Sequence, residues 1–220
     1  MWDEKKLLEI CETYSEGAPK NVVFPEPYIP YVRDPEKWNK ILVLAESQNI
    51  GIDDDYYKWL KKLKPTERMK RLGWKNPPPY TCPDKSDWIG VGPWDGGLGE
   101  LVKSALRAIF EKANLKLKVE DVAVSNAVPW TKKRSGSRNE SSDKEMRCKA
   151  RNFWKEIFGV WNPDLRMIIV LGKKAEEVMN GAGILQKYNG FEIRHPSRAK
   201  KISYNSQAIE KYNKMKHGNQ

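Results

Sequence analysis

Polar side chains that could hold a small planar ligand follow short apolar runs at four places in the chain. The four segments are AESQN (45–49), VSNAV (124–128), LGKKA (171–175) and HPSR (195–198). The amide of Asn126 carries a donor and an acceptor in one plane, so it can read the edge of a heterocycle. The imidazole of His195 can donate a hydrogen bond to an oxygen that gains negative charge. Residues that follow a strand are also common turn formers, and this interpretation stays open for Ser47 and Asn49.

These residues would meet at one edge of a sheet if the apolar runs are parallel strands. Ligands of open α/β sheets bind at the carboxyl ends of the strands, and short runs rich in Ile and Val are typical of strands covered on both faces. We predict strands at 40–45, 121–128, 166–172 and 191–194. We predict helices at 2–15, 54–72, 98–112, 145–160 and 173–179 and at the end of the chain. The alternation predicts an α/β fold, a three-layer α/β/α arrangement around a central, mainly parallel four-stranded sheet.

The length of 220 residues suits a single domain. We expect this domain to carry a helical and Pro-rich N-terminal extension (1–37) and a basic aromatic insertion (50–90). No apolar run approaches the roughly 20 residues that span a bilayer, and the N-terminus lacks the apolar core of a signal peptide. We therefore expect a monomer that is cytoplasmic or associated with the nucleoid.

The charge and the aromatic content favour nucleic acid as the partner. Lys and Arg number 40 against 29 Asp and Glu, which gives a net charge of +11, and there are nine Trp. A basic protein rich in aromatics has nucleic acid as its default partner, although a solvated surface can also be basic by chance. Three widely spaced cysteines and two histidines argue against a disulfide scaffold, a tetrathiolate zinc site and a multi-histidine metal centre.

Four segments, in this order, resemble motifs of the uracil-DNA glycosylase superfamily across roughly residues 40–200. They are LAESQN (44–49), GPWDGGLGELV (92–102), VSNAVPW (124–130) and HPSR (195–198). The second is similar to the Gly-Pro-Phe-x-Gly-x-x-Gly segment of the iron–sulfur branch, which is the branch closest in pattern. The resemblance implies a monofunctional DNA glycosylase that hydrolyses the N-glycosidic bond of uracil or a related deaminated base in base excision repair.

The resemblance also implies roles for individual residues. Trp94 would stack on a base flipped out of the duplex, and Asn126 would pair with O4 and N3–H of uracil. His195 would stabilise the departing base through its O2. Water activation would fall to Glu46, where the iron–sulfur branch has Glu, to Ser47, where other branches have Asp or Asn, or to Asn49, or it would be absent.

The chain departs from the family pattern at two places. The first motif lacks the Gly and the Pro that many members carry there. Cys148 lies near one cluster-binding position of the iron–sulfur branch, but the CxxC pair is missing. We therefore expect no iron–sulfur cluster, no other metal and no cofactor.

Basic residues near the motifs would grip the backbone of the DNA. By the resemblance, Ser197 would bind a phosphate, and Arg198 would reach the backbone or the minor groove. A basic loop after Asn126 would add Lys132, Lys133, Arg134 and Arg138. The insertion would either widen this face or pack as an extra lobe. Its basic residues are Lys58, Lys61, Lys62, Lys64, Arg68, Lys70 and Arg71.

Two other functions stay open. One is a catalytically inactive nucleic-acid-binding module of the same fold, whose first motif has lost its catalytic group. The other is an α/β enzyme that binds nucleotides or transfers groups, which is disfavoured because the chain has no Walker-type GxxxxGK[ST] segment.

Overall fold

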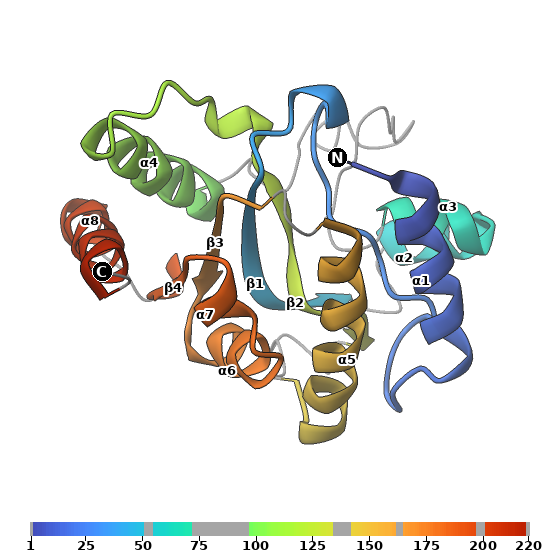
Figure 1. Ribbon diagram of the computed structural model, residues 1–220. Coiled ribbons are helices and arrows are strands. Elements are labelled where there is room, and N and C mark those ends of the chain that lie inside the picture. Colours follow the sequence, from blue (N-terminus) through green and yellow to red (C-terminus); the bar gives the residue numbers. More distant parts are fainter. Residues whose placement is uncertain are drawn as a thin grey trace.

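The computed structural model of the chain describes residues 2–50, 55–71, 97–133, 142–161, 165–196 and 201–218. Its centre is a four-stranded, all-parallel sheet with the strand order β2-β1-β3-β4 (Figure 1). The strands are β1 (Ile41–Ile50), β2 (Ala123–Lys133), β3 (Met167–Leu171) and β4 (Gly190–Ile193). Helices cover both faces of this sheet, which confirms the predicted three-layer α/β/α fold.

The helices form two layers and a side group. They are α1 (Glu4–Glu16), α2 (Asp55–Lys62), α3 (Pro65–Arg71), α4 (Gly97–Lys112), α5 (Lys144–Trp161), α6 (Lys173–Gly181), α7 (Ile184–Lys187) and α8 (Lys201–Gly218), with 3-10 turns at Pro35–Lys37 and Val119–Asp121. One face of the sheet carries α1, α5 and α6, and the other carries α4 and α8 (Figure 1). Within the described ranges, no helix is long and apolar enough to cross a membrane.

Alternate residues of the strands supply the two cores. Leu42 and Leu44 of β1 lie in the core with α1, α5 and α6, whereas Ile41 and Val43 lie in the core with α4 and α8. All five residues of β3 are buried, as expected for a central parallel strand covered on both faces. The two-residue period of the strands therefore decides which helix layer each later side chain faces.

The Pro-rich part of the N-terminal extension covers one edge of the sheet. Residues 22–31, which we call the strap, run antiparallel along β2, with bridges from Val22 to Lys132 and from Tyr31 to Val124. The strap thereby pairs backbone groups that an edge strand would otherwise leave open. The sequence predicts only a Pro-rich extension here, so the pairing of the strap with β2 is new information from the structure.

Two strands run further than the sequence predicts. The strand predicted at 40–45 continues to Ile50, and the one predicted at 121–128 continues to Lys133. The extra length contains a bulge, because one residue of β1 lies between Ser47 and Asn49 while three of β2 lie between their partners Val128 and Lys132. Pro129, which has no N–H to donate, lies in this bulge.

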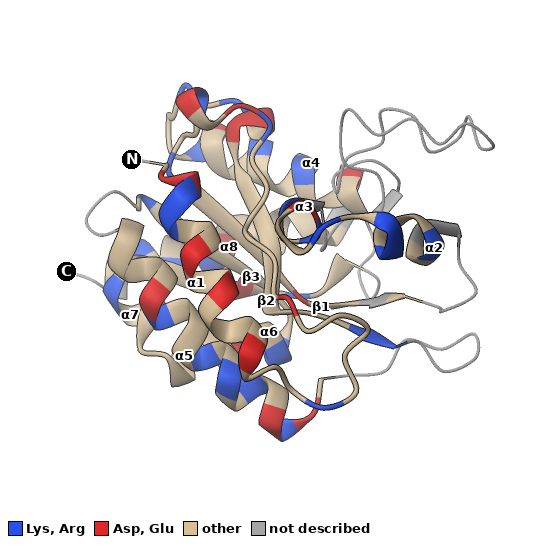
Figure 2. Ribbon diagram, turned by 90° about the vertical axis from the view of Figure 1, so that its right-hand side faces the viewer, with Lys and Arg blue, Asp and Glu red and all other residues tan. Residues whose placement is uncertain are grey.

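The helix predicted at 54–72 is two helices. Pro65 begins α3, because the residue before a proline is disfavoured in helical conformation. Leu60 of α2 packs with Ile50, the last residue of β1, so α2 lies at the carboxyl end of this strand. Figure 2 shows basic residues along α2, which are all lysines, on that side of the molecule.

Candidate active site at the strand ends

The carboxyl edge of the sheet holds three of the predicted motif residues. Asn126 of β2 pairs in register with Ala45, which directly precedes Glu46 in β1. His195 follows two residues after Ile193, the last residue of β4. Strands β1 and β2 continue beyond these residues, but Asn126 and Ala45 lie level with the last residues of β3 and β4. The predicted residues therefore lie where the four-stranded part of the sheet ends, the place where α/β sheets bind ligands.

Several predicted site residues fall on parts of the chain for which no structure is given. Trp94, Ser197, Arg198, Arg134 and Arg138 all lie outside the described residues. Their predicted roles in stacking and in DNA binding stay predictions. Asn49 is the second-last residue of β1 and pairs in register with Lys132.

Asn126 is held by a tyrosine from the strap. Its side chain is 8% exposed, and Nδ2 donates to the hydroxyl of Tyr28 over 2.7 Å. Tyr28 is itself 1% exposed, and its hydroxyl donates to the carbonyl of Val128 over 3.4 Å and accepts from the N–H of Gln48. Burial raises the pKa of Tyr28 above its ordinary value, so the phenol is neutral and retains its hydrogen. Nδ2 of this amide is therefore part of a hydrogen-bond network with Tyr28, Val128 and Gln48.

Sequence reasoning missed Tyr28. It lies between prolines in the segment PEPYIP, which indicates extended backbone but gives no information about the strand that it meets. The partner Asn126 is 98 residues away in sequence. No local pattern connects the two, so only the tertiary structure could have shown the contact.

Asn126 and Glu46 face opposite layers of helices. Val124 packs in the core of α4 and α8, and Ala45 packs against the same core, so strand alternation places Asn126 on that face. The same alternation places Ser47 with Ala45. Ser47 is half-buried, and its side chain makes no hydrogen bond to another described residue. Ser47 alternates with Glu46 along β1 and so points away from the face on which Glu46 binds Ser142.

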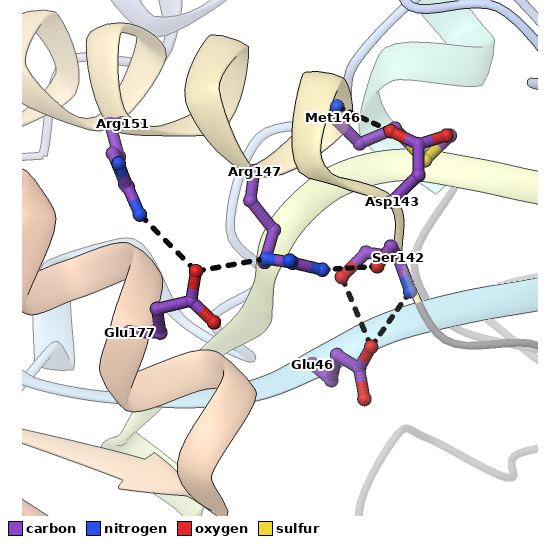
Figure 3. A network of polar contacts seen from close by, with 7 residues as sticks. All are labelled: Glu46, Ser142, Asp143, Met146, Arg147, Arg151 and Glu177. Atoms are coloured by element: carbon purple, nitrogen blue, oxygen red, sulfur yellow. Dashed lines mark hydrogen bonds and ion pairs between the residues drawn. The ribbon is translucent and has the colours of Figure 1, made fainter.

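Glu46 points toward the start of α5, where its carboxylate accepts hydrogen bonds (Figure 3). Its Oε1 accepts hydrogen bonds from the backbone N–H of Ser142 over 2.8 Å and from the Ser142 hydroxyl over 3.0 Å. Ser142 is 3% exposed, and its carbonyl in turn accepts from Nη1 of Arg147. Glu46 thus has a structural partner, which fits an anchor for the first turn of α5 better than a water-activating base.

The same network continues into α6. Glu177 accepts from Nε of Arg147 over 3.2 Å and from Nη2 of Arg151 over 3.3 Å (Figure 3). Asp143 caps α5 by accepting the N–H of Met146 over 2.8 Å. These contacts join β1, α5 and α6 and fix the point at which the chain enters α5.

The backbone at His195 is held by the end of β3. Gly172 has a φ of +92° and donates its N–H to the carbonyl of Ile193 over 2.8 Å. A Cβ added at Gly172 would lie 3.2 Å from the Cβ of His195, so this close approach requires glycine. On the other side, the N–H of Arg194 donates to Oε1 of Gln207 in α8 over 3.2 Å. The half-buried His195 is therefore placed by contacts with both β3 and α8.

The basic residues near the site differ in their exposure. Lys132 and Lys133 were predicted in a loop, but both belong to β2, and Lys132 is only 5% exposed while Lys133 is exposed. A phosphate contact requires an exposed ammonium group, so Lys133 fits the predicted role and Lys132 does not.

In α3, the guanidinium of Arg68 binds both oxygens of the buried Glu26, at 2.6 and 3.1 Å. Arg68 thus packs the insertion onto the strap.

No metal-binding group is visible in the part of the chain that the structure describes. There, no cluster of three or more His, Cys, Asp or Glu side chains could hold a metal ion. Cys11 is buried in the core, which raises the pKa of its thiol, and Cys148 is exposed on α5.

The chain matches no protein-family model, and no curated protein is significantly similar to it. The geometry at the strand ends is therefore the basis for a functional proposal.

Proposed function

We propose that this protein is a monofunctional DNA glycosylase that removes uracil or a related deaminated base from DNA. The observation that carries the proposal is the buried amide of Asn126 at the same sheet edge as His195. A base-excising enzyme needs a group that reads the base edge and a donor that stabilises the leaving base. Asn126 and His195 are suited to these two tasks, and they occur in the order of the superfamily motifs.

Each step of the reaction has a residue of matching chemistry. The flipped base lies between the strands of Asn126 and His195, and Trp94 is proposed to stack on its ring. The bond between C1′ and the base nitrogen breaks, and its electron pair leaves with the base. His195 donates a hydrogen bond to O2 as negative charge grows there. A water bonds to C1′ and loses one proton, which neutralises the departing base anion, and the products are the free base and an abasic site.

Ser47 is the proposed site of water positioning, with Asn49 as the alternative. Ser47 alternates with Glu46 along β1, and Glu46 is bound to Ser142 on the other face. A serine hydroxyl can orient a water but is a weak base. The rate therefore depends chiefly on stabilisation of the departing base by His195.

DNA is the proposed partner, and base excision repair is the proposed process. The exposed Lys133 ends β2, and exposed Lys61 and Lys62 of α2 lie at the same end of the molecule (Figure 2). Contacts of this kind position a duplex without reading its sequence, and they weaken as salt concentration rises. A monomer in the cytoplasm or nucleoid, without a cofactor, is sufficient for this chemistry.

Excision from a defined oligonucleotide tests the proposal. The protein, in excess, is incubated with duplex and single-stranded DNA that contains one uracil, hypoxanthine or xanthine, and abasic sites are cleaved with alkali. Strand cleavage is expected, and His195→Ala should lower the single-turnover rate by about 10²–10³-fold. No cleavage of any of these substrates would refute the glycosylase proposal, and an unchanged rate in the variant would exclude His195 from the mechanism.

An inactive nucleic-acid-binding module is the second candidate function. It is favoured by Glu46, the one carboxylate of the first motif, because its Oε1 is engaged by Ser142. This candidate predicts DNA binding that falls steeply with salt, together with no excision in the assay above.

A further inference from the structure

The hydroxyl of Tyr28 has all of its hydrogen-bonding positions in use. A phenol offers one hydrogen and two acceptor sites. The carbonyl of Val128 can only accept and the N–H of Gln48 can only donate, so the Tyr28 hydrogen points to Val128 and one acceptor site is used by Gln48. The remaining site accepts from Nδ2 of Asn126 over 2.7 Å, so in this structure the amide presents its N–H₂ group to Tyr28.

The bulge between β1 and β2 explains why this hydroxyl is needed. Gln48 lies at the point where one residue of β1 faces three of β2. The regular ladder is interrupted there, and the Tyr28 hydroxyl accepts the N–H of Gln48 in place of a strand carbonyl. The contact to Asn126 is thus built into the irregularity of the sheet.

We infer that Tyr28 is a positioning residue that fixes the orientation of the Asn126 amide and thereby selects bases with a lactam edge. This inference rests on the proposed function. With Nδ2 turned to Tyr28, Oδ1 is left to accept the N3–H of uracil, and the second Nδ2 hydrogen can donate to O4. Cytosine presents an acceptor at N3 and an amino group at C4, so the fixed amide opposes it with like groups. A rotated amide would suit cytosine, and Tyr28 disfavours that rotation.

The inference predicts that the effect of substituting Tyr28 on the excision rate depends on the presence of Asn126. Wild type, Tyr28→Phe, Asn126→Ala and the double variant are compared in single-turnover excision from uracil- and cytosine-containing duplexes. Tyr28→Phe is expected to lower the uracil rate and the preference for uracil over cytosine by about tenfold, the effect of one lost hydrogen bond. In the Asn126→Ala background the same change should have no further effect, because a residue that acts through another is not additive with it.

Tyr204→Phe is the matched control. Tyr204, in α8, is also 1% exposed, but among the described residues its hydroxyl has no hydrogen-bond partner. Its uracil rate should equal that of wild type. Equal losses from Tyr28→Phe in the wild-type and Asn126→Ala backgrounds would show a general structural role and would overturn the inference while leaving the glycosylase proposal intact.

A second measurement observes the amide directly and does not depend on excision. In ¹⁵N-labelled protein, one Asn126 side-chain proton should exchange slowly with solvent in wild type and at least tenfold faster in Tyr28→Phe. Unchanged exchange would refute the fixed amide at any level of activity. If the amide is fixed but wild type excises no base, the proposed function fails and the inferred selectivity fails with it. This outcome differs from equal losses from Tyr28→Phe in the two backgrounds, which would overturn the inference alone.

Discussion

Replacing Gly172 by alanine would test whether the placement of His195 matters for excision. Gly172 has a φ of +92° and a ψ of 162°, a region essentially restricted to glycine, and another residue there costs about 1–3 kcal/mol. The added Cβ also lies 3.2 Å from the Cβ of His195, so the end of β4 must shift by a few tenths of an ångström. Gly172→Ala is expected to lower the free energy of unfolding by about 2 kcal/mol and the Tm by about 6 °C.

Gly183→Ala separates the backbone effect from the effect on His195. Gly183 also has a positive φ, +71°, but a Cβ added there meets no atom within 4 Å. Its substitution should cost about 1–2 kcal/mol of stability and leave the site unchanged. The two variants are compared by calorimetry and by single-turnover excision of uracil at 25 °C, well below either expected Tm.

The rates decide the outcome. Gly172→Ala should excise uracil about tenfold more slowly than wild type, since displacements of less than 1 Å at a catalytic donor are costly. Gly183→Ala should match wild type. Equal rates for the two variants would refute the reasoning that Gly172 positions His195.

Three further substitutions test other parts of the structure. Glu46→Ala removes the acceptor of two buried Ser142 donors and should lower the free energy of unfolding in urea by about 1–3 kcal/mol. Glu46→Gln keeps an acceptor oxygen. Loss of excision with retained stability in Glu46→Gln would restore Glu46 as the water-activating residue. Arg68→Ala leaves the 4%-exposed Glu26 without its ion pair and should cost about 3 kcal/mol in urea unfolding, whereas a neutral result would show that Glu26 becomes protonated or hydrated. Lys133→Ala should weaken DNA binding equally for all sequences and reduce the slope of log K against log salt by about 1; an unchanged slope would place the phosphate contacts elsewhere.

The layers of the fold could be predicted from the sequence because the local composition of a strand indicates its burial. MIIVL at 167–171 is apolar throughout and forms a fully buried strand. The ends of the strands could not be predicted in the same way. Glu46, Ser47 and Gln48 break the apolar run, yet β1 continues through them because β2 pairs with it there and the Tyr28 hydroxyl accepts from the N–H of Gln48.

The candidate site could be predicted only in part. Asn126 and His195 could be identified as candidates from the sequence, because polar residues after apolar runs are easy to find and parallel strands bring their ends together. The role of Tyr28 could not be predicted, because its contact with Asn126 depends on a bulge that no residue pattern indicates. The role of Glu46 in water activation stays a prediction, and its contact with Ser142 could not be predicted because the two residues are 96 positions apart in the sequence.

The strap also affects how the chain is assembled during synthesis. Its residues leave the ribosome about a hundred positions before β2, because the contact from Tyr28 to Asn126 spans 98 residues. The nascent chain must therefore keep an apolar, proline-rich segment without its partner strand while β1 and the helices α2, α3 and α4 are made. Domains with such long-range pairings fold slowly and expose surfaces on which chains associate. For this protein, the step that closes the sheet edge is the same step that brings Tyr28 to Asn126, so a chain that has not finished folding has no oriented amide at its strand ends.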